Sequence, residues 1–395
     1  MHESKEVYVW LGLGACASAH FVKQRLWIGI IIGGLVWWTR NPKFIFYLGL
    51  ALGLIYAARE KRCGVIGIVF FFVVLWPKII FSIAPKVPYW HNWLDATGLA
   101  FLGLGAFYYW RERYDGRIPS FTMGQWFGYF LFPSNPLNPI NIAPSDFISK
   151  RSSALPWIEA WKGLLLAATK AGAIYGLKIY LGKNYYPNWN SKTFFTVWDQ
   201  LKWWQAWAAL FTTYISYVLW LSATADVVVS IARFYGLNLF YNYRWALLAW
   251  NPVELWRRWA IYNRRLLLKT VYFPLGGRNR YVYRNILLTF LASALVLHSG
   301  WVGSRYWTVG QNMVWLYSAY FLAQGLAVCG CVAYWHYRGK DPSSDRRLRW
   351  SFPRLLTTIL TQSFAAWVHL LILCPYETSW EIRVKAMLYA LGIKS

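Results

Sequence analysis

Long apolar stretches separated by short, basic loops make up most of this chain. A helix that crosses the hydrocarbon core of a membrane needs about 20 apolar residues, and about ten stretches come near that length. The second and third are short, so they are tilted, half-inserted or fused. The pattern predicts an all-α, multi-pass membrane protein with these spans: Val7–Val22, Trp27–Thr39, Phe44–Ala58, Gly64–Ala84, Trp93–Trp110, Leu155–Gly182, Trp203–Arg233, Asn285–Ser304, Asn312–Trp335 and Leu355–Leu373.

Two segments interrupt the pattern of spans. Between Pro119 and Pro144 the chain is apolar but holds three further prolines, which predicts a re-entrant or broken element rather than one straight helix. From residue 240 to 284 aromatic side chains alternate with Arg and Lys, which predicts short helices at the cytoplasmic surface. The terminal stretch Trp380–Leu391 is predicted to be interfacial as well. Because no separate soluble domain is visible, residues 1–395 are predicted to form a single membrane domain.

Composition agrees with a membrane protein. Hydrophobic residues make up 57% of the chain and charged residues 14%, well under the roughly 25% that is usual for soluble domains. The formal net charge of +26 would suggest nucleic acid in a soluble protein, but the basic residues here lie in short loops between apolar spans. Membrane lipids are therefore the expected partner, and nucleic acid is not.

The basic loops also predict an orientation, since Lys and Arg concentrate on the cytoplasmic side. Pairs of predicted spans separate the four most basic loops, so all four can lie in the cytoplasm: 59–62, 111–117, 257–284 and 338–354. The loops at 77–92, 183–202, 305–311 and 375–379 are then predicted to lie outside.

Neither a signal peptide nor a cysteine framework is expected. Residues 1–6 are short and mixed in charge, so Val7–Val22 is predicted to be a retained first helix. The five cysteines have neither zinc-site spacing nor a disulfide pattern, so they are expected to be packing residues and no metal site is predicted.

A charged aromatic block followed by a lone histidine carries the candidate chemistry. The block contains Trp256, Arg257, Arg258, Trp259, Arg264, Arg265 and Lys269. The span that follows it, residues 285–304, has one ionisable side chain, His298, and an ionisable group inside hydrocarbon marks a functional site by default. His298 lies about 13 residues into that span, or roughly 20 Å, which is past the midplane of a core about 30 Å thick.

This pairing resembles the membrane-bound O-acyltransferase (MBOAT) family, and most of all its bacterial branch that acylates polysaccharides and teichoic acids. The matching residues are Trp256 to Trp259, Pro274 to Gly277, and His298, with weaker likeness across residues 222–303 that includes Asp226. The resemblance implies a multi-pass enzyme of the bacterial plasma membrane that transfers an acyl group to the hydroxyl of an extracytoplasmic glycan. It also implies acetyl-CoA or an acyl-carrier thioester as the donor, no permanently bound cofactor, and a secreted or membrane partner that completes the transfer.

The resemblance assigns a role to each part of the block. His298 would be the general base, because a neutral imidazole can take a proton from an attacking hydroxyl. Arg257, Arg258, Arg264 and Arg265 would attract the phosphates of coenzyme A or an acidic carrier protein. The alternative for each arginine is to anchor the cytoplasmic face, and Trp256 and Trp259 are expected to set the surface helices.

Ala260 departs from the family pattern. Relatives place a histidine, asparagine or aspartate directly after the block, whereas alanine can neither hydrogen-bond nor move a proton. Asn263 lies about one helical turn further on, on a similar helix face, and is the predicted substitute that orients the acceptor or polarises the carbonyl.

Other interpretations of the intramembrane polar residues stay open. His298 could be a core histidine with satisfied hydrogen bonds, as is expected of His369. Asp226 and Lys170 lie within predicted spans, where they either pair inside the bundle or take a direct role. Two alternative functions remain: transfer to a lipid or sterol hydroxyl, and a transporter or acyl-binding scaffold that kept the fold without turnover. Ala260 favours the scaffold, and His298 argues against it.

Overall fold

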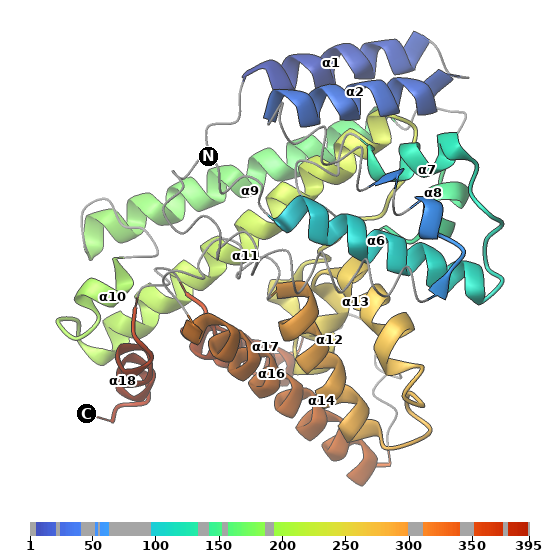
Figure 1. The fold of residues 1–395 in the computed structure, drawn as a ribbon. Helices are drawn as coiled ribbons and strands as arrows, with labels where there is room; N and C mark the ends of the chain where they lie inside the picture. The colour runs from blue at the N-terminus through green and yellow to red at the C-terminus, as the bar shows by residue number, and fades with distance from the viewer. Residues whose placement is uncertain are drawn as a thin grey trace. The chain divides into compact units, whose positions relative to one another are not determined.

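A computed structural model describes these residues: 5–20, 24–40, 52–53, 56–62, 96–132, 142–151, 157–185, 193–298, 311–339, 351–373 and 378–393. Within them the protein is all-α, as predicted, and contains helices and one isolated β-bridge but no strand (Figure 1). The chain divides into two compact units, Met1–Ala168 with Ala223–Asn242, and Thr169–Ser222 with Tyr243–Ser395. We call them unit 1 and unit 2.

Unit 1 is built on the N-terminal helices. Helix α1 packs along α2, and α2 packs on α7 (Figure 1). Its elements are α1 (Lys5–His20), α2 (Arg25–Arg40), α6 (Ala96–Tyr114), α7 (Met123–Phe130) and α8 (Pro144–Ser149), together with the first part of α9 (Trp157–Asn184) and the last part of α11 (Trp203–Phe234).

Unit 2 contains the remaining parts of α9 and α11 and every element that follows. Helix α16 is its centre, since α12, α14 and α17 all pack against it. The elements are α10 (Phe194–Val197), η4 (Ala246–Leu248), α12 (Pro252–Arg258), α13 (Ile261–Leu267), η5 (Leu268–Tyr272), α14 (Val282–Ala292), η6 (Ser293–His298), α16 (Gln311–Tyr337), α17 (Phe352–His369) and α18 (Trp380–Ala390).

Three helices in the described part of the chain are long and apolar enough to cross a membrane: Trp157–Asn184, Trp203–Phe234 and Trp315–Tyr337. Only 17% of the most apolar stretch of the first is buried, so most of its apolar side chains need a lipid environment. These helices indicate a membrane protein with several spans. The predicted spans at α1, α2, α6, α14 and α17 do form helices, but shorter or less apolar ones. The predicted span 64–84 lies outside the described residues.

Both interrupting segments are broken up in the described residues, as predicted. Helix α7 begins with a capping box between Thr122 and Gln125, and α8 is a separate helix that starts at Pro144. Residues 133–141, with the three central prolines, lie outside the described part. Between residues 240 and 284 the structure has the four short elements η4, α12, α13 and η5.

Candidate active site

Local sequence determines where α12 begins. Asn251 is the N-cap residue, and its Oδ1 accepts a hydrogen bond of 2.8 Å from the backbone N–H of Glu254. Pro252 occupies the first turn, where its missing N–H costs nothing. Glu254 adds a negative charge near the positive end of the helix dipole. The residues Asn251 to Glu254, directly before the block, are therefore a helix-starting sequence.

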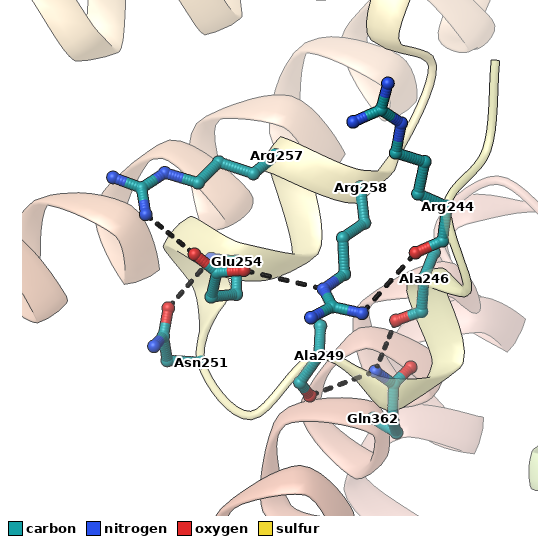
Figure 2. Close-up of polar contacts among 8 residues, drawn as sticks. All are labelled: Arg244, Ala246, Ala249, Asn251, Glu254, Arg257, Arg258 and Gln362. Carbon is teal, nitrogen blue, oxygen red and sulfur yellow. Dashed lines mark hydrogen bonds and ion pairs between the residues drawn. The ribbon is translucent and has the colours of Figure 1, made fainter. Parts of the chain in front are cut away.

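Glu254 also pairs with the two arginines of α12, Arg257 and Arg258 (Figure 2). Its Oε1 accepts from Nη1 of Arg257 at 2.7 Å and its Oε2 from Nε of Arg258 at 3.4 Å. The Arg258 guanidinium lies 5.1 Å from the Trp250 ring centroid, and the Arg258 carbonyl accepts from the backbone N–H of Arg244 at 2.9 Å. Arg257 and Arg258 thus both pair with Glu254 within α12, and Arg258 also packs on Trp250.

The side chain of Gln362 in α17 holds the turn at η4, which precedes α12, against the rest of unit 2. Its amide Nε2 donates to the carbonyls of Ala246 and Ala249, at 3.0 and 3.3 Å (Figure 2). Its Oε1 accepts from the Tyr214 hydroxyl at 3.2 Å. Sequence reasoning missed this residue, although a glutamine within an apolar predicted span was a usable signal.

Ala260 joins α12 to α13 in a left-handed conformation, with φ +41° and ψ +56°. Asparagine and aspartate enter this region more readily than alanine does. Asn263 lies in the first turn of α13 and is half-buried.

The cations of α13 differ from those of α12. Nε of Arg264 is buried without a hydrogen-bond partner among the described residues, whereas Arg265 is exposed. Burial lowers the pKa of Arg264, and the nearby charges of Arg257 and Arg265 lower this pKa further. An anion placed here would relieve that repulsion, so Arg264 is the block arginine best suited to a phosphate.

His298 ends a π-helical turn, η6, that continues directly from α14. Its Nδ1 lies 2.8 Å from the carbonyl oxygen of Ser293. A carbonyl only accepts, so Nδ1 carries the proton and donates, which leaves the lone pair of the neutral ring on Nε2. Single π-helical turns occur frequently at functional sites.

The ring of His298 packs against α16. It stacks on Tyr317 at a centroid distance of 5.6 Å and lies 4.6 Å from the Phe321 ring. Trp256 of α12 packs on the same Phe321 ring, at 5.8 Å. The block and the histidine, which are distant in sequence, therefore meet on one side chain of α16.

The other tryptophan and the glycine turn complete this arrangement. Trp259 lies 5.4 Å from Tyr243 and 6.3 Å from Trp256, measured between ring centroids. Gly276 and Gly277 both have positive φ, at +105° and +58°, so the predicted turn after Pro274 is present.

Asn285 connects that turn to α14 and was not predicted as a site residue. The side chain is fully buried. Its Nδ2 donates to the carbonyls of Leu275 (3.1 Å), Gly277 (3.0 Å) and Arg280. The helix that carries His298 is thereby tied to the turn at its start. The signal in the sequence was a polar residue at the beginning of an apolar span.

Asp226 is the predicted site residue that belongs to the other unit of the chain. It is fully buried on α11 but belongs to unit 1, whereas the rest of the predicted site belongs to unit 2. Lys170, the other intramembrane charge, donates to Ser222 Oγ at 2.6 Å within unit 2. The part of the chain that the structure describes has no group of three potential metal ligands.

Comparison with known proteins leaves the site to be judged by its geometry. No protein-family model matches the sequence. No curated protein matches it either.

Proposed function

We propose that the protein is a membrane-embedded O-acyltransferase with about ten membrane spans, similar in architecture to the membrane-bound O-acyltransferases. The observation that carries the proposal is the shared contact of Trp256 and His298 with the Phe321 ring. It joins the two sequence features that motivate this function. His298 suits the role of a general base, because its Nδ1 is hydrogen-bonded and the lone pair of the neutral ring lies on Nε2.

The reaction needs two proton transfers, one from the acceptor hydroxyl to His298 and one from His298 to the sulfur of the donor. Nε2 of His298 takes the proton of the acceptor hydroxyl, and the hydroxyl oxygen bonds to the thioester carbonyl carbon. The carbon–sulfur bond then breaks, and the imidazolium returns the proton to the departing thiolate. Donor and acceptor exchange one acyl group, and no cofactor is consumed.

The donor is acetyl-CoA or an acyl-carrier thioester, and Arg264 and Arg265 are the side chains that would attract its phosphates or acidic groups. Glu254 already neutralises part of the charge of Arg257 and Arg258, so these two contribute more to structure. The acceptor is the hydroxyl of an extracytoplasmic glycan, the protein lies in a bacterial plasma membrane, and a secreted or membrane partner completes the transfer.

The test is to compare ester-bound acyl groups in cells that carry wild-type protein or His298→Gln, which keeps much of the side-chain volume. Mass spectrometry of surface glycans and membrane lipids measures the esters, with the amounts of both proteins in the membrane matched. His336→Gln is the control, because this histidine lies at the other end of α16 beside Tyr283.

The expected result is loss of one glycan ester in His298→Gln and no loss in His336→Gln. Loss of a lipid ester instead would identify a lipid hydroxyl as the acceptor. Unchanged esters in His298→Gln, with folded protein present, would show that His298 is not a general base and would favour a scaffold or transporter.

A further inference from the structure

Gln324 of α16 is fully buried, but only the oxygen of its side-chain amide has a hydrogen-bond partner among the described residues. Its Oε1 accepts a hydrogen bond of 3.3 Å from the indole N–H of Trp256. Its Nε2 makes no hydrogen bond to any residue that the structure describes. A buried amide nitrogen without an acceptor is costly and calls for an explanation.

The orientation of this amide follows from its neighbour. An indole N–H can only donate, so the group that faces it must be the amide oxygen. The NH2 group therefore points away from Trp256, with both hydrogens available. Only an acceptor, such as a carbonyl oxygen or an oxyanion, can satisfy it.

Gln324 lies on the helix face that contacts His298. Tyr317, Phe321 and Gln324 are spaced i, i+4 and i+7, so they share one face of α16. His298 packs on the first two, and Trp256 packs on Phe321 and donates to Gln324. The base and the unsatisfied donor thus belong to one continuous set of contacts, with Phe321 in the middle.

We propose that Gln324 is a further catalytic residue, whose Nε2 donates to the carbonyl oxygen of the acyl group. Acyl transfer places a negative charge on that oxygen in the tetrahedral intermediate, and amide donors that already point toward it stabilise the transition state. Trp256 is the positioning residue that fixes the amide. The inference rests on the proposed acyl transfer and supplies the polar function that Ala260 lacks.

This assignment differs from the one that the sequence suggested. Asn263 was the predicted carbonyl-polarising group, on the ground that it lies one turn after Ala260. Gln324 is more buried than Asn263, and its amide orientation is defined by the contact with Trp256. An oxyanion donor needs both properties, because low solvent access strengthens the hydrogen bond and a fixed amide needs no reorganisation.

The experiment uses membranes that contain the full chain, with radiolabelled acetyl-CoA as the probe over a range of concentrations up to saturation. It measures label in glycan and lipid, released acetate, and the thermal stability of each variant. Gln324→Leu removes the donor, and Gln324→Glu keeps the size but offers acceptors. Gln362→Leu is the control, since Gln362 is a buried glutamine of the same unit whose amide is hydrogen-bonded at both ends.

The expected result for Gln324→Leu and Gln324→Glu is a fall in turnover of about 100- to 1000-fold, the usual effect of removing one oxyanion donor. Transfer and hydrolysis should fall together, because both pass through the same intermediate, while the KM for acetyl-CoA changes little. Gln324→Leu should change stability little, because it removes an unsatisfied donor but also the acceptor of the Trp256 indole N–H. Gln362→Leu should lose stability, with turnover falling only as folded protein is lost.

A double-mutant cycle tests the positioning role of Trp256. Trp256→Phe keeps an aromatic ring but frees the amide to rotate, so turnover should fall by about tenfold, less than on losing the donor itself. Adding Trp256→Phe to Gln324→Leu should cost little more, because the two residues act as a unit.

Two outcomes separate this inference from the proposed function. Wild-type membranes with no more transfer or hydrolysis than His298→Gln membranes would overturn both. Active wild type with unchanged turnover in Gln324→Leu would overturn the role of Gln324 alone, and so would a loss of turnover that only follows a loss of stability.

Discussion

Ala260 has a strained backbone, and the strain can be measured. A non-glycine residue in the left-handed region costs roughly 1–2 kcal/mol, whereas glycine there costs about 0.5–1 kcal/mol in chain entropy. Ala260→Gly should therefore raise the free energy of unfolding by about 0.5–1 kcal/mol. Thermal unfolding in detergent or nanodiscs measures the change.

Ala249→Gly is the matched control from the same segment. Ala249 has φ −76°, so glycine relieves no strain there, adds freedom to the unfolded chain and also removes a buried methyl group. It should lower stability. Equal effects of the two substitutions would mean that Ala260 carries no strain.

Arg264 and Arg258 are expected to have different roles, Arg264 in donor binding and Arg258 in stability. Arg264 has a pKa lowered by burial and by neighbouring cations, so Arg264→Gln removes repulsion and should not lower the melting temperature. If this arginine attracts the donor, the same change should raise the KM for acetyl-CoA by about tenfold, an effect that weakens as salt screens the charges.

Arg258→Gln is the contrasting variant. It breaks a partly exposed pair with Glu254, so it should cost about 1 kcal/mol of stability and have a smaller effect on KM. A larger rise in KM for Arg258→Gln than for Arg264→Gln would assign donor binding to α12 instead.

At the scale of elements, the stability of the turn before α14 is expected to depend on the side-chain amide of Asn285. Asn285 donates to three backbone carbonyls, and Asn285→Asp replaces the donor by an acceptor of the same size. Carboxylate and carbonyl oxygens would then face each other in a buried site, which should cost about 3 kcal/mol or more. Thermal stability and acyl turnover should both fall.

Asn279→Asp provides the comparison, because Asn279 lies on the same turn with an exposed side chain. Surface changes of this kind usually stay within about 0.5 kcal/mol. A small effect at Asn285 as well would show that the turn does not depend on its amide.

The long helices could be predicted because apolar length alone defines them. The expected span 203–233 is α11, Trp203–Phe234, and the expected span 312–335 is α16, Gln311–Tyr337. The π-helical turns η5 and η6 could not, since a shift from i→i+4 to i→i+5 hydrogen bonds depends on tertiary packing rather than on the apolar pattern. The depth inferred for His298 assumed an unbroken α-helix, and η6 changes that rise.

The candidate site was predictable residue by residue but not as a group. His298 and Trp256 were visible because charge and indole rings are conspicuous beside apolar spans. Gln324, like Gln362, stood out only as a glutamine within an apolar span. The sequence gives no sign that its amide oxygen accepts a hydrogen bond while its amide nitrogen has no partner among the described residues. Asp226 looked equivalent to the others in the sequence, which gives no sign that it belongs to unit 1 and they belong to unit 2.

At the scale of the whole molecule, each unit has a contact that involves a loop predicted to lie in the cytoplasm. In unit 1 the loops 59–62 and 111–117 meet through Glu60 and Arg113, whose Oε2 and Nε are 3.6 Å apart. In unit 2 Arg354, in the first turn of α17, lies over the ring of Trp250, which precedes α12, with its guanidinium 3.9 Å from the ring centroid.

Site-directed cysteine labelling tests this orientation directly. Lys61 and Lys202 are both exposed and lie in loops predicted to be on opposite sides. In a variant without native cysteines, a membrane-impermeant maleimide should label Lys202→Cys on intact cells but Lys61→Cys only after permeabilisation. The reason is that loops rich in Lys and Arg stay in the cytoplasm. The inverse pattern would reverse the orientation and place the block arginines outside, where no cytoplasmic thioester could reach them, so it would also remove the proposed route of the acyl group.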